Sequence, residues 1–343
     1  MSKRPKPVRR ALRGALGLIG ALGLLVAACG GTTAPAPSPP PAAGSFPVSI
    51  AAANGTIHIA RRPDAIVSLS PTATEMLYAI GAGHQVKAVD MDSDYPPGVP
   101  RTSLDGYQPN AEAIAAYKPD LVVVAGDTSD LTWHLGALGI PVLSEPAATT
   151  LQQAYNQIEQ LGQATGHVAP AASVVATMKR QIATIVRTVP KAQAPRTYYY
   201  ELDPTFYSVT SSTFIGQVLS LLGLTDVADA APGASGSGGY PQLSAEYIVK
   251  ANPDFIFLAD TLCCAQNATT VSARPGWATI QAVVAHHVVG LNDDIASRWG
   301  PRIVDLMRTV ADAVNAASTT TASSSTTTSS TTTAGSGAGG SSG

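Results

Sequence analysis

The sequence predicts an α/β protein with two halves of related construction, and three observations support this. One module occurs twice, in residues 111–125 and again in residues 245–259. Short apolar runs alternate with amphipathic ones through most of the chain, which is the pattern of strands and helices packed in layers. A long amphipathic segment, residues 170–189, lies between the two copies in sequence. We therefore expect two α/β lobes with a long helix between them.

The repeated module begins with a short helix that carries an acidic residue. In each copy a glutamate, Glu112 or Glu246, stands seven residues before a Pro-Asp pair. The residue before a proline disfavours the α conformation, so each helix should stop there and the apolar run that follows should form a buried strand. The duplication would place both glutamates at equivalent points of one composite surface, which suits docking onto a two-fold symmetric partner. The alternative is that both are solvated helix residues.

Local signals predict the remaining elements. Prolines open two of the helices, at Pro71 and Pro170, and glycines end three of them, at Gly81, Gly166 and Gly223. The stretch 92–109 is expected to be a loop. The predicted strands are residues 65–70, 85–90, 121–125, 140–143, 197–202, 255–259 and 287–291. Besides the two module helices, the predicted helices are residues 71–80, 131–138, 151–165, 170–189, 214–222 and 301–317.

The N-terminus has the pattern of a bacterial lipoprotein signal. Residues 1–13 hold six basic residues and no acidic one, and residues 15–28 contain only Ala, Leu, Gly, Ile and Val. This run is shorter than the roughly 18 residues that indicate a membrane span, and it stops at Cys29. We expect cleavage before Cys29 and lipidation of its thiol; the alternative is an ordinary secretory signal with an incidental cysteine. Either signal places the mature protein outside the cytoplasm.

Composition sets the expected domain boundaries. The chain after the signal is rich in Gly, Thr, Ala, Pro and Ser, as in an extended tether, and the C-terminal end holds only Ser, Thr, Ala and Gly, as in a disordered tail. The expected parts are a signal peptide (1–28), a tether (29–46), an N-terminal α/β lobe (47–168), an interlobe helix (169–190), a C-terminal α/β lobe (191–317) and a tail (318–343).

Charge and cysteine content exclude several classes of function. Loss of the six basic residues of the signal leaves 15 basic and 23 acidic residues, a formal charge of −8. A net negative surface does not suit nucleic-acid binding. Apart from Cys29, the only cysteines are the adjacent pair Cys263 and Cys264, so no disulfide can join distant parts of the fold.

Four segments, in order and at characteristic spacing, carry a resemblance to a known family: residues 66–75 (IVSLSPTATE), residues 92–97 (DSDYPP), the two modules, and residues 300–303 (GPRI). Together they resemble the cobalamin and ferric-siderophore substrate-binding proteins of ABC importers. The resemblance covers about residues 47–317. It implies two Rossmann-like lobes joined by a single long rigid helix, the class III periplasmic-binding-protein fold, with residues 170–189 as the candidate helix.

The resemblance also implies a function. A ligand that is a cobalt- or iron-containing chelate would sit between the lobes, with no other cofactor and no catalysis. Glu112 and Glu246 would meet arginines of the permease, whose ATPase drives transport, and the lipid on Cys29 would hold the protein at the membrane. The chain departs from cobalamin-binding members at Ala125-Gly126 and at Asp92, so its pocket is expected to be less aromatic and more polar.

Aromatic faces and a few polar groups would hold such a chelate. Tyr107 and Tyr240 shortly precede the two glutamates, so they are expected to approach the cleft from opposite lobes; the alternative is that loop aromatics pack on their own lobe. Arg274 and Arg298 could pair with ligand carboxylates or phosphate, or equally with acids such as Asp293 or Asp294. Arg302 is interpreted as structural. The aromatic candidates are Tyr95, Tyr107, Tyr207, Tyr240, Trp277 and Trp299.

Two further groups are open to more than one interpretation. Cys263 and Cys264 could form a vicinal disulfide near the cleft, remain reduced or contact a soft metal; no spacing supports a structural zinc site. The histidines show no metal-ligand spacing, and only His134, beside Trp133, is a candidate axial ligand.

Two other classes of function are alternatives to transport. A secreted hydrolase would need a GxSxG elbow, a P-loop or a metal triad, and the predicted lobes, residues 47–317, contain none of these. The other alternative is a lipid-anchored sensor or scaffold that uses the same fold without transport.

Overall fold

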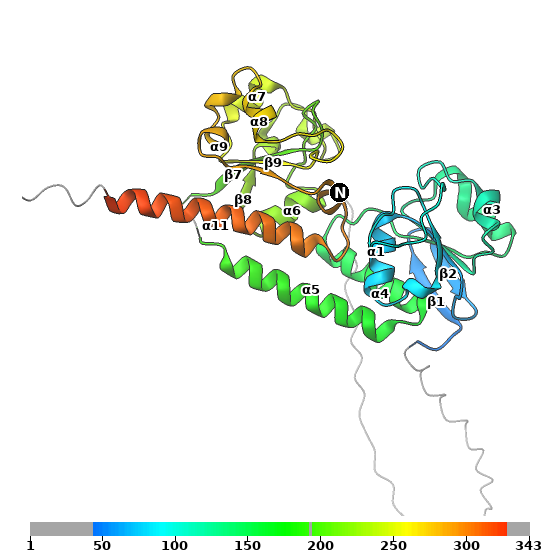
Figure 1. The fold of residues 1–343 in the computed structure, drawn as a ribbon. Coiled ribbons are helices and arrows are strands. Elements are labelled where there is room, and N and C mark those ends of the chain that lie inside the picture. Colours follow the sequence, from blue (N-terminus) through cyan, green and yellow to red (C-terminus); the bar gives the residue numbers. More distant parts are fainter. Residues whose placement is uncertain (1–43, 192–193, 328–343) are drawn as a thin grey trace, which may run out of the picture. The chain divides into compact units, whose positions relative to one another are not determined.

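The computed structural model describes residues 44–191 and 194–327 of the chain, drawn in Figure 1. The predicted signal peptide, the lipidation of Cys29, most of the tether and the last part of the tail lie outside the described residues. Phe46, which we expected in the tether, packs against the hydrophobic core. Within the described ranges no helix is both long and apolar enough to cross a membrane.

The chain folds into ten strands and eleven α-helices within the described ranges. The strands are β1 (Val48–Ala52), β2 (Gly55–Ile59), β3 (Ile66–Leu69), β4 (Val86–Val89), β5 (Leu121–Val124), β6 (Val142–Ser144), β7 (Arg196–Glu201), β8 (Leu224–Asp226), β9 (Phe255–Leu258) and β10 (Val288–Gly290). The helices are α1 (Pro71–Ala79), α2 (Ala111–Ala115), α3 (Leu131–Ala137), α4 (Leu151–Thr165), α5 (Val168–Thr188), α6 (Phe214–Ser220), α7 (Ala245–Ala251), α8 (Ala268–Ser272), α9 (Gln281–Val284), α10 (Asp293–Ser297) and α11 (Ile303–Thr327). Short 3₁₀ turns are η1 (Gly83–Gln85), η2 (Thr128–Asp130), η3 (Val227–Ala230), η4 (Ala234–Gly236) and η5 (Trp277–Thr279).

The two halves have the same topology. One four-stranded sheet has the order β4-β3-β5-β6 and the other β8-β7-β9-β10, with every pairing parallel. In each half the first strand leads to a helix (α1 or α6), then to a second strand, and then to the repeated module (α2-β5 or α7-β9). The internal repeat seen in the sequence is therefore a duplication of a whole half. It makes Glu112 and Glu246 equivalent in topology.

The duplicated Pro-Asp pair has the same structural role in both halves. The Asp120 carboxylate accepts the backbone N–H of Ala65 at 3.2 Å, at the entry to β3. The Asp254 carboxylate accepts the backbone N–H of Thr197 at 2.8 Å, near the start of β7. Each aspartate also returns a backbone hydrogen bond to the same residue. The aspartate thus aligns the central strand of each sheet with its neighbour.

Alternation along the central strands divides the core between two faces. In β5, Leu121 and Val123 face one hydrophobic cluster while Val122 and Val124 face another. In β9, Phe255 and Phe257 face the first of these clusters, whereas Ile256 and Leu258 face a third. The shared cluster also contains buried residues of α4, α5 and α11. A period of two in strands buried on both faces gives continuous apolar runs, which is what the sequence shows.

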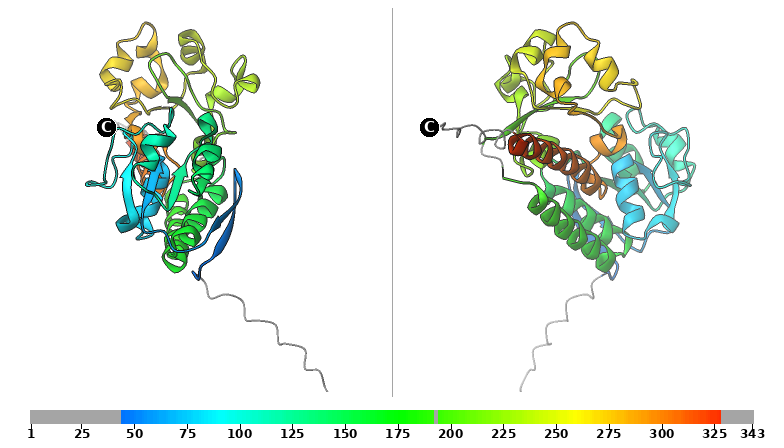
Figure 2. Two further views of the ribbon diagram at one scale, coloured as in Figure 1. Left: turned by 90° about the vertical axis from the view of Figure 1, so that its right-hand side faces the viewer. Right: turned by 60° about the vertical axis from the view of Figure 1, so that its left-hand side comes forward.

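The long helix predicted between the halves is α5, which begins two residues before Pro170 and ends two residues before Pro190. It packs against α4 on one side and against α11 on the other. Figure 1 and the right-hand view of Figure 2 show α5 and α11 side by side. The rigidity of α5 stays a prediction.

Several elements differ from the sequence prediction, including the short helices α8, α9 and α10, which we did not predict. β1 and β2 form an antiparallel hairpin that we did not predict, although Asn54-Gly55 is a strong hairpin signal and Gly55 has a φ of +110°. β8 was also missed because three residues carry too little pattern. α11 continues past Ala317, the predicted end of the helix, to Thr327. In its extension the hydroxyls of Ser318 and Thr319 donate to carbonyls one turn earlier.

The role of the paired aspartates can be tested by matched substitutions. Asp120→Ala and Asp254→Ala should each lower the free energy of unfolding by about 1–3 kcal/mol, because each leaves strand-entry N–H groups unpaired. Urea unfolding with constant slope would measure this. The control Glu159→Ala removes an exposed carboxylate of α4 and should change stability by less than about 0.5 kcal/mol. Equal effects in all three variants would contradict the assigned role.

Candidate ligand-binding cleft

A cavity of about 770 Å³ opens at the carboxyl ends of β3, β4 and β5. Its walls include Ser70 after β3, Asp90 after β4 and Ala125 after β5. Residues of the second half, Cys263 and the segment from Asp294 to Trp299, close it on another side. The carboxyl edge of parallel strands is where α/β folds bind ligands, since the strand-to-helix loops converge there.

Local structure positions the polar groups of this edge. Ser70 caps α1, because its hydroxyl accepts the Ala73 N–H, and the first residues of α1, Pro71 and Thr72, line the cavity beside it. Asp90 is only 1% exposed, and its carboxylate accepts the Ser93 N–H at 2.8 Å. Burial raises the pKa of Asp90, and the hydrogen bonds from Ser93 oppose that rise.

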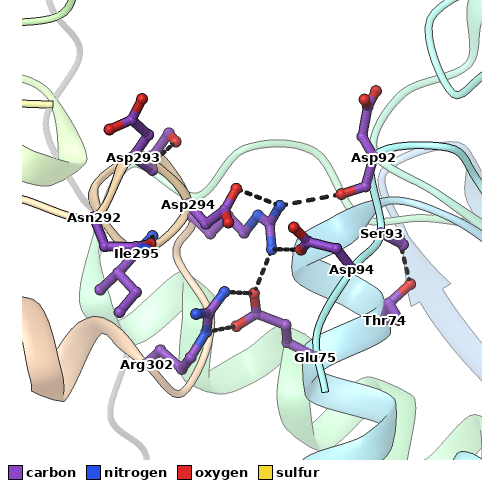
Figure 3. Close-up of polar contacts among 12 residues, drawn as sticks. Thr74, Glu75, Asp92, Ser93, Asp94, Asn292, Asp293, Asp294, Ile295 and Arg302 are labelled. Carbon is purple, nitrogen blue, oxygen red and sulfur yellow. Dashed lines mark hydrogen bonds and ion pairs between the residues drawn. The ribbon is translucent and has the colours of Figure 1, made fainter. Parts of the chain in front are cut away.

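Arg298 forms the centre of an ion cluster that spans the two halves, shown in Figure 3. One terminal nitrogen donates to Glu75 at 2.9 Å and to Asp94 at 3.0 Å. The other donates to Asp294 at 2.8 Å and to the backbone carbonyl of Asp92 at 3.1 Å. Burial works against the charge of Arg298, but the surrounding carboxylates outweigh it, so the net effect raises the Arg298 pKa. Every terminal nitrogen is engaged by the protein itself.

Glu75 is the buried carboxylate of this ion cluster. Its side chain is 2% exposed although it lies on α1, and it accepts from both Arg298 and Arg302. The Arg302 guanidinium also lies over the Tyr95 ring, 4.1 Å from its centroid. Two guanidinium groups thus neutralise a buried carboxylate, which would be costly to bury alone. The interpretation of Arg302 as structural agrees with these contacts.

The wall from the second half is a loop held by one carboxylate. Asp293 accepts the backbone N–H groups of Thr261, Leu262 and Cys263 at 2.8 to 3.0 Å. The structure joins Cys263 and Cys264 by a disulfide, and Cys263 lines the cleft. Asp293 therefore sets the position of this wall.

Comparison with known protein families shows to which family the chain belongs. The model of the family described as periplasmic binding protein matches residues 66–295. The chain belongs to the periplasmic binding protein family. This confirms the relation to substrate-binding proteins of ABC importers that the sequence predicted.

Individual relatives agree with that assignment. The chain is 31% identical over 280 residues to YvrC of Bacillus subtilis, an uncharacterized ABC transporter substrate-binding lipoprotein, covering 78% of this chain and 86% of that protein. It is 32% identical over 311 residues to a cobalamin-binding protein of Halobacterium salinarum, covering 86% and 83%. The crystal structure of the vitamin B12 binding protein BtuF of Vibrio cholerae aligns with a TM-score of 0.63 and 25% identity, covering 75% and 98%. The predicted α/β fold class is thereby confirmed.

The aromatic residues that we predicted as ligand contacts lie at different sites in the structure. Tyr107 lines the cleft and is 81% exposed, and Trp299 lines it with its ring nitrogen donating to Gln157. Tyr95 lies instead in a neighbouring cavity of about 400 Å³ between α1, α5 and the start of α11. Tyr207 and Tyr240 are exposed but do not line the cleft.

Two predicted ligand contacts are wrong. Trp277 is fully buried, stacked on Phe206, because it fills the core on one face of the second sheet. Arg274 lies over that tryptophan and donates both terminal nitrogens to Glu201 at 2.6 Å. The sequence analysis gave an ion pair as the alternative role of Arg274. The structure shows such a pair, but with Glu201 instead of Asp293 or Asp294. For Arg298 the alternative, pairing with Asp294, is what the structure shows.

The two duplicated glutamates are both exposed. Glu112 lies in the first turn of α2, capped by Asn110, and Glu246 lies in the first turn of α7, capped by Ser244. No described residue forms a hydrogen bond or ion pair with either carboxylate. Their availability to a partner agrees with docking, which stays a prediction. His134 is exposed on α3, and the described residues contain no group of three side chains suited to a metal ion.

Sequence reasoning missed the acidic partners of Arg298 and several buried acids elsewhere in the fold. Glu75 and Asp94 stood in the segments that carried the resemblance, yet only the structure shows that they meet Arg298. Burial raises the pKa of Asp226 and of Asp260 to about 7 and that of Glu145 to about 8. Glu145 follows β6 and is 4% exposed, and its Oε1 has no partner among the described residues.

The buried Glu145 predicts a specific pH dependence of stability. Its pKa rises from an ordinary 4.5 to about 8 on folding, so between these values the folded state holds a proton that the unfolded state has lost. Stability should therefore fall as pH rises from about 5 to 8.5. In Glu145→Gln this fall should be smaller by on the order of 4 kcal/mol. Unfolding free energies across the pH range would measure it, and an unchanged pH slope in Glu145→Gln, with Glu159→Gln as control, would contradict it.

Proposed function

We propose that this protein is a lipid-anchored, extracytoplasmic substrate-binding protein that delivers a metal-chelate nutrient, a corrinoid or a ferric siderophore, to an ABC importer. The observation that carries the proposal is the cleft of about 770 Å³ at the carboxyl edge of the first sheet, closed by residues of the second half. Its volume lies in the range of small-molecule sites. The names of the relatives, which include cobalamin-binding and vitamin B12 binding proteins, support the class of ligand.

Different residues of the cleft contact different parts of the ligand. Tyr107 offers an exposed aromatic face that a flat macrocycle or an apolar chelate surface can cover. The aspartates along the wall accept hydrogen bonds from amide N–H groups of a ligand. Arg298 and Glu75 do not contact ligand in this scheme; they hold the wall in place. Function consists of binding and release, with no covalent chemistry.

The first test is a ligand titration. Absorbance and Trp299 fluorescence should show saturable binding of at least one chelate from a panel of cyanocobalamin, cobinamide, haem and ferric siderophores. The melting temperature should rise with that ligand, since binding to the folded state stabilises it. Tyr107→Ala should weaken binding by about three- to tenfold, the loss expected for one aromatic contact. Tyr117→Ala, which removes an exposed tyrosine outside the cleft, should leave affinity unchanged.

No binding across the whole panel would contradict the proposal. Turnover of a generic ester or phosphate would contradict it as well, because it would indicate a hydrolase.

The second test addresses docking. Exposed ion pairs contribute only about 0.2–1 kcal/mol each, so the glutamates would set orientation and encounter rate rather than tight affinity. The double variant Glu112→Lys, Glu246→Lys should lose uptake in cells or in liposomes that hold the permease and its ATPase, while chelate affinity stays unchanged. Glu159→Lys, the same charge reversal on α4, should transport normally. Normal uptake by the double variant would contradict the docking role and leave ligand binding untouched.

A further inference from the structure

The charge of the cleft is unbalanced. The charged residues that line it are four aspartates and two arginines. Asp94 and Asp294 share Arg298, and Asp90 is held by Ser93. The carboxylate of Asp92 is exposed and has no hydrogen bond or ion pair with any described residue. Figure 3 shows the Asp92 carboxylate pointing away from Asp94 and Asp294. Arg298 binds only the backbone carbonyl of Asp92.

The arginines of the cleft offer little to an anionic ligand. Arg298 uses both terminal nitrogens for four protein acceptors, so an incoming carboxylate would have to displace one of them. Arg101 donates its Nε to the Met91 carbonyl and keeps its terminal nitrogens for solvent or ligand. The Arg101 guanidinium can therefore pair with one anionic group of a ligand. A second anionic group of the same ligand would lie among the aspartates.

The remaining lining is apolar or neutral. Leu69, Pro71 and Trp299 supply apolar surface, and Thr72, Thr128 and Ser297 supply hydroxyl groups. A ligand with an apolar or aromatic body and a rim of N–H donors fits this lining, since carboxylates are acceptors only. A ligand with several carboxylates or catecholate oxygens would bring acceptor against acceptor and negative charge against negative charge.

We propose that the cleft selects among metal chelates by charge, taking neutral or cationic chelates with amide N–H groups and rejecting polyanionic ones, with Asp92 as the residue that discriminates most. This inference rests on the function proposed above and narrows its ligand class. It favours corrinoids and ferric hydroxamates over haem and ferric tris-catecholates.

The size of the effect follows from Coulomb's law with screening intermediate between that of bulk water and that of a protein surface. A unit charge within about 6–8 Å of Asp92 at a partly exposed site corresponds to roughly a three- to tenfold change in affinity. Added salt should reduce the discrimination, because the carboxylate is exposed.

The experiment uses ligands matched in shape and different in charge. One pair is cyanocobalamin and its monocarboxylic acid, in which one peripheral amide is replaced by a carboxylate. A second series is the ferric complex of desferrioxamine B, which carries one positive charge, with its neutral N-acetyl and its singly negative N-succinyl derivatives. The protein should bind the less negative member of each set more tightly, and Asp92→Asn should shrink that preference by about three- to tenfold. Glu159→Gln, the same change of charge outside the cleft, should leave the preference intact.

The outcomes separate this inference from the proposed function. Equal binding of matched ligands, tighter binding of the anionic member, or an unchanged preference in Asp92→Asn would overturn charge selection while chelate binding stands. If no member of either set binds and the wider panel is also silent, the proposed function fails and this inference fails with it. A preference that does not weaken as salt rises would also overturn it, and this measurement needs no variant.

Discussion

The cleft depends on the ion pairs that the buried Glu75 carboxylate makes with two arginines. Glu75 lies on α1 in the first half, and its partners, Arg298 and Arg302, lie 223 and 227 residues later in the chain. A buried charge without a partner costs several kcal/mol, so Glu75 is tolerated only when both arginines are in place. The loop after β4 and the segment between α10 and α11 must therefore meet at α1. That meeting forms the charged wall of the cleft.

The same constraint shapes what the cleft can bind. Because Arg298 is saturated by Glu75, Asp94, Asp294 and a carbonyl, it serves the architecture and not the ligand. The wall is left with more acceptors than donors. Next to Asp294, Asp293 accepts three backbone N–H groups and sets the position of the loop that carries the disulfide. Both walls are thus positioned by carboxylates whose partners come from distant parts of the chain.

Much of the fold follows from local pattern. Apolar runs bounded by proline and glycine correctly predicted the positions of β3, β5, β7 and β9. The two copies of the module predicted the equivalent helices α2 and α7. The Pro-Asp pairs ended the helices as expected, with the residues before proline, Lys118 and Asn252, at positive φ. The hairpin of β1 and β2 was missed although its turn signal was present. The site was less predictable: Tyr107, Arg298 and Trp299 line the cleft, whereas Trp277 and Arg274 are parts of a buried cluster in the second half.

The sequence by itself determined the duplicated α/β plan, the order of its elements, and the exposure of Glu112 and Glu246, because strand alternation, helix caps and proline stops are encoded within a few residues. Only the tertiary structure decided which charged groups meet. An arginine in a loop carries the same local signal whether it faces a ligand or a buried glutamate. The choice depends on which segments pack together across some two hundred residues, and no local pattern contains that information.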